Sequence, residues 1–433
     1  MKKHIAELLL AALVLFSLAG CIKTEKKKDP DKGVELNVVT SYGRGDGNRK
    51  SFEAAVASYE AKTGVKVIDG SSTSNEEWKN DVLTDFMTGS EPDVLFYFTD
   101  VDAEPFINAG RVVSIEEIRE EYPDYATNMK QAMMAVASDG KHYAVPSTGY
   151  WENLFVNRRV LKACGVSLSG PDYNWDSFLR DCETIRRAGY TPLACSLFEI
   201  PHYLFEFAVL NNGTLDTHLK IPHCEGGHLV RDDAAESWIA GIEDIKALYQ
   251  QGYLPENTLT ATDAETVDLF AQGKAAFLID GSWKVGYLTE YYPDHLDDFV
   301  VSFVPGKGAR KATEAIGGIS MGYFITRKAW NDPQKREAAV SFVFHMTSEE
   351  VLSSFITTEV TALIDGASPK GLNAIQRSAA ETNGQITGIV GAVQDGISSE
   401  AKSELFADIQ KCVTGQMSAE AAVEAAIRLN EEP

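Results

Sequence analysis

After a charged segment near its start, the chain alternates short runs of β-branched and aromatic residues with segments whose apolar residues recur at helical spacing. Residues 34–40, 65–68 and 92–98 are predicted strands, and residues 51–63 are a predicted helix that Gly64 ends. The alternation continues through the middle of the chain, and the last third is mainly helical. Successive strand–helix units of this kind predict an α/β fold with largely parallel sheets.

Length and charge narrow the class of protein. The chain has 433 residues, which is too many for a single compact core and suits two domains. Its formal net charge of −23 disfavours nucleic acid, because such binding depends on lysine and arginine at phosphates. The same charge disfavours broad adsorption to anionic lipid. We therefore expect no nucleic-acid partner and no electrostatic membrane contact.

The first residues predict export and lipid anchoring. Residues 1–20 combine two early lysines with a short apolar run, as in a secretory signal peptide. The run ends in Leu-Ala-Gly followed by Cys21, a lipobox-like pattern in which Cys21 becomes the first mature residue and carries the lipid. Residues 21–33 are charged and bury little, so they predict a flexible tether. A plain signal peptide with a coincidental cysteine is the alternative.

The other cysteines and a histidine-rich stretch each allow two interpretations. Five cysteines follow Cys21, an odd number whose spacings match no disulfide scaffold. We expect buried free thiols, with a disulfide between Cys182 and Cys195 as the alternative. Four residues that could hold zinc lie close together, but no surrounding pattern matches a known metal site, so we favour a variable loop without metal. They are His218, His223, Cys224 and His228.

Several short motifs follow one another along most of the chain. They are FEAAVASYEAKTGVKV at 52–67, PDVL at 92–95, AGRVVSI at 109–115, YAVP at 143–146, LFVNRRV at 154–160, WDSF at 175–178, GYTP at 189–192, FAQGKAAF at 270–277, DGSW at 280–283, VPG at 304–306 and GG at 317–318. In this order they resemble the extracellular solute-binding proteins of ABC importers, of the maltose and multiple-sugar type. Residues 195–235 and the C-terminal region depart from the family pattern.

The resemblance implies a particular architecture. Its fold is α/β, a type II periplasmic-binding-protein-like fold whose two lobes are mainly parallel sheets flanked by helices and joined by a hinge. On this chain we expect the first lobe at residues 34–147 and 303–330. We expect the second lobe at 148–302 and 331–433. The chain would then cross between the lobes near each of these boundaries.

Open α/β sheets bind ligands beyond the carboxyl ends of their strands, so the segments after the predicted strands should supply the site. Aromatic and acidic side chains there suit a pyranose, whose C–H face stacks on a ring while its hydroxyls bond carboxylates. Trp283 lies where the family's Gly-Ser-Trp motif meets the cleft, and we expect it to be the stacking platform; a core tryptophan is the alternative. The other predicted ligand-binding residues are Tyr42, Arg44, Tyr97, Asp100, Trp151, Glu152, Gly317 and Gly318.

These features predict an extracytoplasmic, lipid-anchored binding protein rather than an enzyme. It would hold a mono- or oligosaccharide between its lobes by hinge closure and pass it to ABC permease subunits, as a monomer without cofactor or metal. No Gly-x-x-x-x-Gly-Lys-Ser/Thr loop occurs, so we expect no ATP hydrolysis by this chain. Two alternatives remain: an extracellular carbohydrate-active hydrolase, and a ligand sensor for a membrane receptor.

Overall fold

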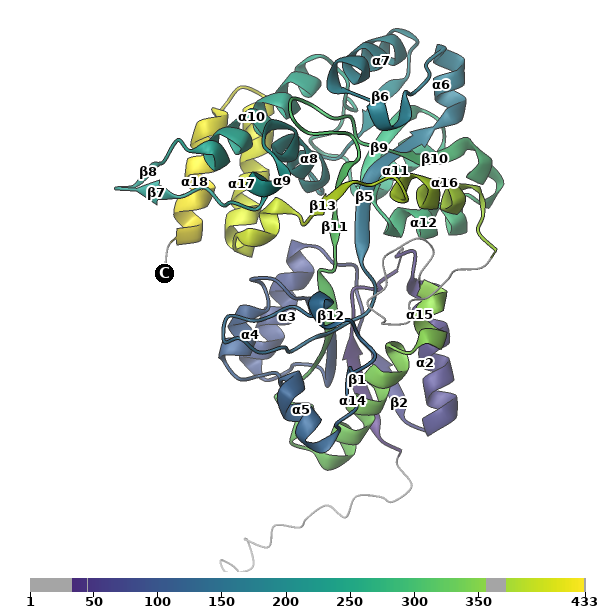
Figure 1. The fold of residues 1–433 in the computed structure, drawn as a ribbon, viewed down its shortest axis with the longest axis vertical. Coiled ribbons are helices and arrows are strands. Elements are labelled where there is room, and N and C mark those ends of the chain that lie inside the picture. The colour runs from purple at the N-terminus through teal and green to yellow at the C-terminus, as the bar shows by residue number, and fades with distance from the viewer. Residues whose placement is uncertain (1–32, 45, 356–370, 432–433) are drawn as a thin grey trace, which may run out of the picture. The chain divides into compact units, whose positions relative to one another are not determined.

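The computed structural model describes residues 33–44, 46–355 and 371–431, and two large β-sheets organise them (Figure 1). The predicted signal peptide, Cys21 and almost all of the predicted tether lie outside the described residues. A small third sheet is a two-stranded hairpin of β7 (Cys224–Glu225) and β8 (His228–Leu229).

The first sheet has five strands in the order β2-β1-β3-β12-β4. β1 pairs in parallel with β2 and β3, whereas β12 pairs antiparallel with both β3 and β4. We call this sheet and its helices the first lobe. Its elements are β1 (Glu35–Val39), α2 (Arg49–Thr63), β2 (Lys66–Asp69), α3 (Glu76–Thr88), β3 (Val94–Phe98), α4 (Glu104–Asn108), α5 (Ile115–Glu121), η1 (Gln131–Met133), β4 (Val145–Pro146), β12 (Met321–Ile325), α13 (Arg327–Trp330), α14 (Pro333–Met346) and α15 (Glu349–Phe355).

The second sheet has six strands, five of them in the order β13-β11-β5-β9-β6, with β10 paired to β5. β6 pairs in parallel with β9 and β13 with β11, whereas β5 pairs antiparallel with β9, β10 and β11. We call this sheet and its helices the second lobe. Its elements are β5 (Tyr150–Asn157), α6 (Arg158–Cys164), η2 (Gly170–Asp172), α7 (Trp175–Arg187), β6 (Thr191–Ala194), α8 (His202–Asn212), α9 (Leu215–His218), α10 (Asp233–Gln250), α11 (Asp263–Ala271), β9 (Ala275–Gly281), α12 (Trp283–Tyr291), η3 (Pro293–Asp298), β10 (Phe299–Ser302), β11 (Glu314–Gly318), α16 (Ala374–Asn383), β13 (Gly388–Val390), η4 (Val393–Gly396), α17 (Ser399–Val413) and α18 (Ala419–Glu431).

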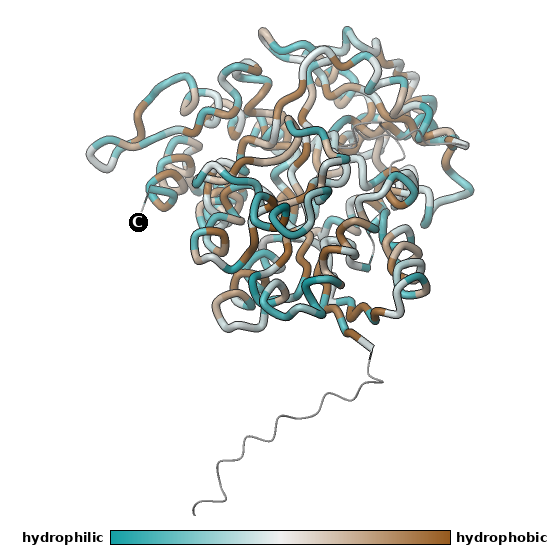
Figure 2. The backbone as a smooth tube through the Cα atoms, turned by 60° about the horizontal axis from the view of Figure 1, so that its bottom comes forward, coloured by the Kyte–Doolittle hydropathy of each residue, from teal (hydrophilic) through white to brown (hydrophobic). Residues whose placement is uncertain are grey.

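Aromatic side chains fill the space between each sheet and its helices. In the first lobe, Tyr59 of α2 meets Phe342 of α14 edge-on at 5.2 Å, and its hydroxyl donates to the carbonyl of Ala338. In the second lobe, Trp238 of α10 is fully buried and packs edge-on against Phe205 of α8 at 5.3 Å. Figure 2 shows apolar and polar stretches alternating along the chain, as expected when each element buries one face.

Local sequence signals explain where several helices begin and end. α2 ends at Gly64, whose φ of 74° is a left-handed conformation that glycine adopts without strain. α11 begins with a capping box, in which the side chains of Thr262 and Glu265 each accept from the other's backbone N–H. α14 begins at Pro333, with Asp332 as its N-cap. The sequence predicts these boundaries, and the structure confirms them.

Strand pairing divides the chain between the lobes at different places from those the family pattern predicts. β11 pairs with β5 and β13 of the second sheet, although the pattern assigns residues 303–330 to the first lobe. α14 and α15 pack against α2, although the pattern assigns residues 331–433 to the second lobe. The two sheets are also mixed rather than mainly parallel. Hydrophobic periodicity identifies a strand but does not say which sheet it joins, and β11 and β12, in different sheets, are neighbours in the sequence.

Two further features bear on the predictions from sequence. Among the described residues, Cys164, Cys182, Cys195, Cys224 and Cys412 are free thiols, as expected; three are buried, whereas Cys164 and Cys224 are only partly buried. Across the described ranges, none of the helices combines the length and apolarity needed to cross a lipid bilayer.

Candidate functional site

Three aromatic side chains gather where β5, α8 and α12 begin. Trp283 is the first residue of α12, and its ring centroid lies 5.6 Å from that of Tyr203 on α8 and 6.2 Å from that of Tyr150 on β5. The rings are tilted by 41° and 32° to the indole. All three side chains are only partly buried. This set, which we call the aromatic cluster, therefore leaves part of its aromatic surface accessible.

The backbone at Gly281 makes room for the indole of Trp283. A Cβ built on Gly281 would lie 2.1, 2.3 and 2.4 Å from three atoms of the six-membered ring, so no other residue fits there without moving Trp283. The turn from β9 into α12 is fixed by the N–H of Ser282, which donates to the carbonyl of Trp151 at 2.9 Å. The orientation of the indole is thus set by a glycine two residues before it.

Three buried carboxyl groups lie beside the aromatic cluster. Glu152 on β5, Glu206 on α8 and Asp280 on β9 are each at most 3% exposed. Each has one oxygen without a hydrogen-bond partner among the described residues. Burial raises the pKa of Tyr203, and the charges of Asp280 and Glu152 raise it further. The carboxyl groups also interact within the protein, since Glu152 and Glu206 share a side-chain hydrogen bond and Oδ2 of Asp280 lies 3.6 Å from Nζ of Lys284.

Burial keeps part of this group protonated at neutral pH. It raises the pKa of Glu206 to about 8 and that of Glu152 well above its usual range, where the charge of Glu206 adds to the effect. Burial also raises the pKa of Asp280 to about 7, although the ammonium of Lys284 opposes this shift. A protonated carboxyl group both donates and accepts hydrogen bonds. These three carboxyl groups can therefore either donate a hydrogen bond to a hydroxyl group or accept one from it.

The first lobe contributes acidic residues from the segment after β3. The N–H of Asp102 donates to Oδ1 of Asp100 at 3.0 Å, and Asp102 also pairs with Lys79 of α3 at 2.8 Å and Lys402 of α17 at 3.0 Å. Because α17 belongs to the second lobe, Asp102 joins the two lobes. Burial raises the pKa of Asp100 to about 7, and the charges of Asp102 and Asp395 add to it. Asp100 is therefore held near acidic groups of both lobes.

Four of the predicted ligand-binding residues lie at or near this region. Trp283 belongs to the aromatic cluster, and Glu152 is one of its carboxyl neighbours. Gly318 pairs with Tyr150 in the sheet, and a Cβ there would meet open space. Asp100 belongs to the first lobe, and besides burial the charge of Asp395 in the second lobe raises the pKa of both Asp100 and Tyr150. These four residues come from four separate segments of the chain, and their role in binding stays a prediction.

The other five predicted residues lie elsewhere. Tyr42, Tyr97 and Trp151 are at most 5% exposed, and each packs against other aromatic rings of its own lobe. Gly317 lies against the backbone of β5 and the side chain of Ile389, and Arg44 is exposed. Side chains alternate between the two faces of a strand, so a residue near a strand end faces the core as readily as a ligand.

Sequence reasoning missed Tyr150, Tyr203, Glu206 and Asp280 as individual site residues. Two of them adjoin predicted positions, since Tyr150 precedes Trp151 and Asp280 begins the Asp-Gly-Ser-Trp motif. Tyr203 lies in the region that departs from the family pattern, so the resemblance gave no signal there. Glu206 offers a signal of its own, because it is a single carboxylate in the apolar run of α8 from Leu204 to Leu210.

The histidine-rich stretch does not converge. His218 is buried, whereas His223 and His228 are partly or largely exposed and approach different carboxylates, Asp232 at 3.5 Å and Glu424 at 3.9 Å. In the part of the chain that the structure describes, no three His, Cys, Asp or Glu side chains are arranged to hold a metal ion.

Residues 318–322 read Gly-Ile-Ser-Met-Gly, the spacing of a hydrolase nucleophile motif. In hydrolases this motif forms a sharp turn from a strand into a helix. Here it links β11 to β12, two strands of different sheets, and the carbonyl of Ser320 accepts from the N–H of Thr99 at 2.8 Å. The local structure therefore differs from that of a nucleophile elbow.

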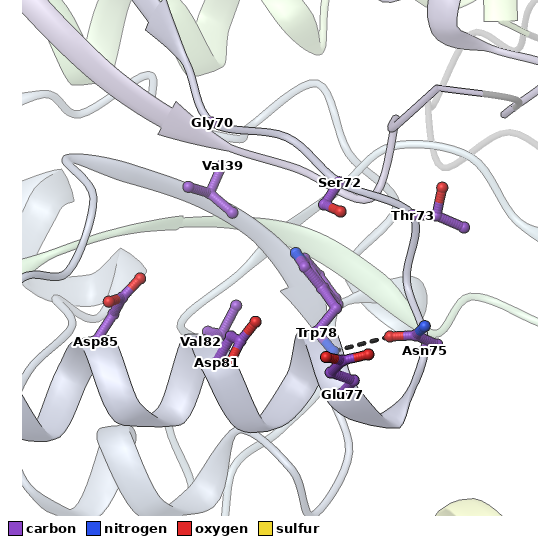
Figure 3. A pocket seen from close by; sticks show the side chains of 10 residues that line it. All are labelled: Val39, Gly70, Ser72, Thr73, Asn75, Glu77, Trp78, Asp81, Val82 and Asp85. Atoms are coloured by element: carbon purple, nitrogen blue, oxygen red, sulfur yellow. Dashed lines mark hydrogen bonds between the residues drawn. The ribbon is translucent and has the colours of Figure 1, made fainter.

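A pocket of about 440 Å³ lies in the first lobe beside α3 (Figure 3). Its walls include Asp81 and Asp85 of α3, the loop residues Ser72 and Thr73, and Trp78. The backbone N–H of Trp78 donates to Oδ1 of Asn75 at 2.8 Å. None of the three rings of the aromatic cluster lines it. This pocket is therefore distinct from the site around Trp283.

Comparisons with known proteins identify the family. A sequence profile of the bacterial extracellular solute-binding proteins matches residues 54–385. Among solved structures, a chitin oligosaccharide binding protein is 18% identical with a TM-score of 0.79, covering 92% of this chain and 98% of that one. The solute-binding protein RafE in complex with raffinose is also 18% identical, with a TM-score of 0.73 and coverages of 92% and 100%.

A further similar structure comes from Thermotoga lettingae TMO, an ABC transporter solute-binding protein bound with α-D-tagatose. It is 16% identical, with a TM-score of 0.70 and coverages of 92% and 98%. A search of curated proteins found no match. The matched profile spans more than half of the chain and includes strands of both sheets, and the solved structures share the two-lobe fold. The chain therefore belongs to the bacterial extracellular solute-binding proteins, a family of binding proteins that work outside the cytoplasm.

Proposed function

We propose that this protein binds a carbohydrate at the aromatic cluster and delivers it to the permease of an ABC importer. One observation carries the proposal: a half-buried indole, Trp283, lies with two tyrosine rings beside three buried carboxyl groups. Similar solved structures are described as binding chitin oligosaccharide, raffinose and tagatose, which supports a sugar as the ligand.

The chemistry of the cluster suits a sugar ring. The apolar C–H face of a pyranose stacks on the indole of Trp283. Its hydroxyl groups then meet Glu152, Glu206 and Asp280, which accept hydrogen bonds and, where protonated, also donate them. The absence of a Cβ at Gly318 leaves space beside Tyr150.

Binding draws the two lobes together. A ligand on Trp283 of the second lobe that also contacts the first lobe, for which Asp100 is the candidate, favours the closed form, because contacts to both lobes supply differential affinity. A micromolar dissociation constant, about −8 kcal/mol, retains the sugar and still permits its release to the permease. The chain acts as a monomer, and no cofactor takes part.

The N-terminal region determines where this happens. The signal peptide at residues 1–20 directs export, and lipid on Cys21 anchors the protein to the cell membrane. Residues 21–33 let the folded part move near the surface. The closed form then docks on permease subunits whose ATPase is a separate protein.

Thermal denaturation across a carbohydrate panel tests the proposal. A sugar at about 100 times its dissociation constant adds about 2.7 kcal/mol to the free energy of unfolding, so one member of the panel should raise Tm. Trp283→Ala should abolish this shift while changing the unliganded Tm little, because the indole is only partly buried.

Trp175→Ala is the matched control, since Trp175 is also partly buried in the second lobe but packs against Phe178 away from the cluster. It should leave the sugar-induced shift intact, whatever its effect on the unliganded Tm. A sugar shift that persists in Trp283→Ala contradicts the proposed site. Chromatography that shows the sugar chemically altered after incubation contradicts the proposed function and favours a hydrolase.

A further inference from the structure

The loop after β1 meets α12 backbone to backbone. A Cβ built on Gly47 would lie 2.5 Å from the carbonyl oxygen of Trp283 and 2.8 Å from Cα of Gly286. A Cβ built on Gly286 would lie 2.8 Å from both Cα and O of Gly47. Gly47 belongs to the first lobe and Gly286 to the second, so this contact, which we call the glycine seam, joins the lobes.

The glycines of the seam have no other evident reason to be glycine. Neither has a positive φ, so the backbone conformation itself permits alanine at both positions. Gly286 lies inside α12, where glycine is among the least favourable residues. The close approach of the two backbones is the feature that excludes a side chain.

Charged residues near the glycine seam also interact across the boundary between the two lobes. Lys50 of α2 pairs with Glu290 of α12 at 2.8 Å. Asp46 lies next to the seam in the sequence and senses the ammonium of Lys284, which lowers its pKa against the larger raising effect of burial. The helix that carries Trp283 is therefore also the helix on which the first lobe rests.

We propose that the glycine seam sets how closely the two lobes approach, so that Gly47 and Gly286 are positioning residues for the ligand site. This inference rests on the proposed function, because the lobe approach is what lets a ligand on Trp283 contact the first lobe. A methyl group at either position holds the lobes apart and weakens ligand binding, although neither position belongs to the aromatic cluster.

Carbodiimide cross-linking of the mature protein tests the seam without any ligand. The reagent forms an amide between a lysine and a carboxylate that are in contact, so Lys50 and Glu290 report lobe approach. Lys246 and Glu243, 3.2 Å apart on α10, provide an internal reference within one helix. In Gly286→Ala and in Gly47→Ala the ratio of the first cross-link to the second, measured by mass spectrometry of peptides, should fall at least fivefold. An unchanged ratio in both variants overturns the proposal.

Calorimetry with the sugar identified by the panel is the second arm. The dissociation constant should rise at least tenfold in Gly286→Ala while the unliganded Tm stays equal or rises, because alanine favours the helix. Lys62→Ala is the control, since Lys62 of α2 is largely exposed and its ion pair with Glu350 lies within the first lobe. It should bind within about twofold of the wild type, as expected for loss of a weak exposed pair.

The outcomes separate the two proposals. Unchanged affinity in Gly286→Ala overturns the role of the seam even if the cross-link is lost. If the wild-type protein binds no sugar of the panel, the proposed function fails, and the cross-link ratio alone still decides whether the seam limits lobe approach.

Discussion

Glu206 carries a carboxyl group that is fully buried on α8 and interacts with that of Glu152. Its contact with the amide of Gln394 is long, at 3.4 Å, and no lysine or arginine forms an ion pair with it among the described residues. An ionised carboxylate in such a place is costly, which is why its pKa rises to about 8. The folded protein therefore holds a proton that the unfolded chain releases.

This proton links stability to pH. A glutamate of the unfolded chain loses its proton near pH 4.5, whereas Glu206 in the folded protein keeps it up to about pH 8. Between these values the folded state binds more protons, so the free energy of unfolding falls as pH rises. Glu206→Gln removes the titration and should raise Tm at pH 8 by about 2 °C or more, a shift that corresponds to about 1 kcal/mol.

At pH 5 the same variant should differ little from the wild type. Glu404→Gln, which removes an exposed carboxylate of α17, is the control and should leave the pH dependence of Tm unchanged. Calorimetry at both pH values would refute the assignment if Glu206→Gln kept the full wild-type slope.

The contact between Gly281 and Trp283 makes a second prediction at this scale. Gly281→Ala should displace the indole and weaken sugar binding at least tenfold, about 1.4 kcal/mol, because its Cβ would overlap the ring. In a Trp283→Ala background the ring is gone, so adding Gly281→Ala should cost no further affinity. Additive losses in this double-mutant cycle, measured by titration calorimetry, would show that Gly281 acts by another route.

Individual site residues were predictable from the sequence only where a motif marked them. Trp283 ends the Asp-Gly-Ser-Trp motif and Glu152 lies just before the motif at 154–160, and the structure places both at the cluster. Tyr42 follows β1, Tyr97 lies near the end of β3 and Trp151 near the start of β5, yet all three face cores. A strand's direction is visible in the sequence, but the face that each terminal side chain takes depends on packing partners distant in the chain.

At the scale of elements, α3 and α17 are joined through Asp102. Its carboxylate accepts from Lys79 and Lys402 and from the hydroxyl of Ser399, and it is only 4% exposed. Burial raises the pKa of Asp102, but the two ammonium groups outweigh it and lower the pKa overall. The segment after β3 is thereby fixed to a helix of the second lobe.

Lys402→Met removes one of the two ammonium groups that pair with Asp102, and we expect it to destabilise the closed form. Removing one member of a buried charge network leaves the others less well compensated, which costs about 2–5 kcal/mol in comparable cases. We expect sugar affinity to fall at least tenfold. Lys411→Met, on the exposed face of the same helix, should leave affinity unchanged. Equal affinities for the two variants in titration calorimetry would contradict a role for the joint.

Elements themselves were predictable where their signals are local. α2, α11 and α14 begin or end at residues that a single turn of sequence identifies, such as Gly64 and the pair Thr262 and Glu265. The strand β12 shows the limit of such signals. Its apolar residues identify it as a strand. Its place between β3 and β4 depends on tertiary packing between segments that are far apart in the sequence.

At the scale of the whole molecule, the two lobes meet through contacts on separate helices of the second lobe. α12 carries the glycine seam and the ion pair with Lys50, and α17 carries the joint with Asp102. The first residue of α12 is also Trp283, the proposed stacking platform. On that proposal, ligand contact and lobe contact involve the same helix.

The position of β12 has a consequence for how the protein is made. The first sheet needs this strand between β3 and β4, yet β12 comes after most of the second sheet in the sequence. During synthesis, β3 and β4 therefore lack the strand that lies between them until several strands of the second sheet have emerged. The halves of the molecule therefore cannot mature one after the other, and a chain terminated before residue 321 keeps a gap in its first sheet.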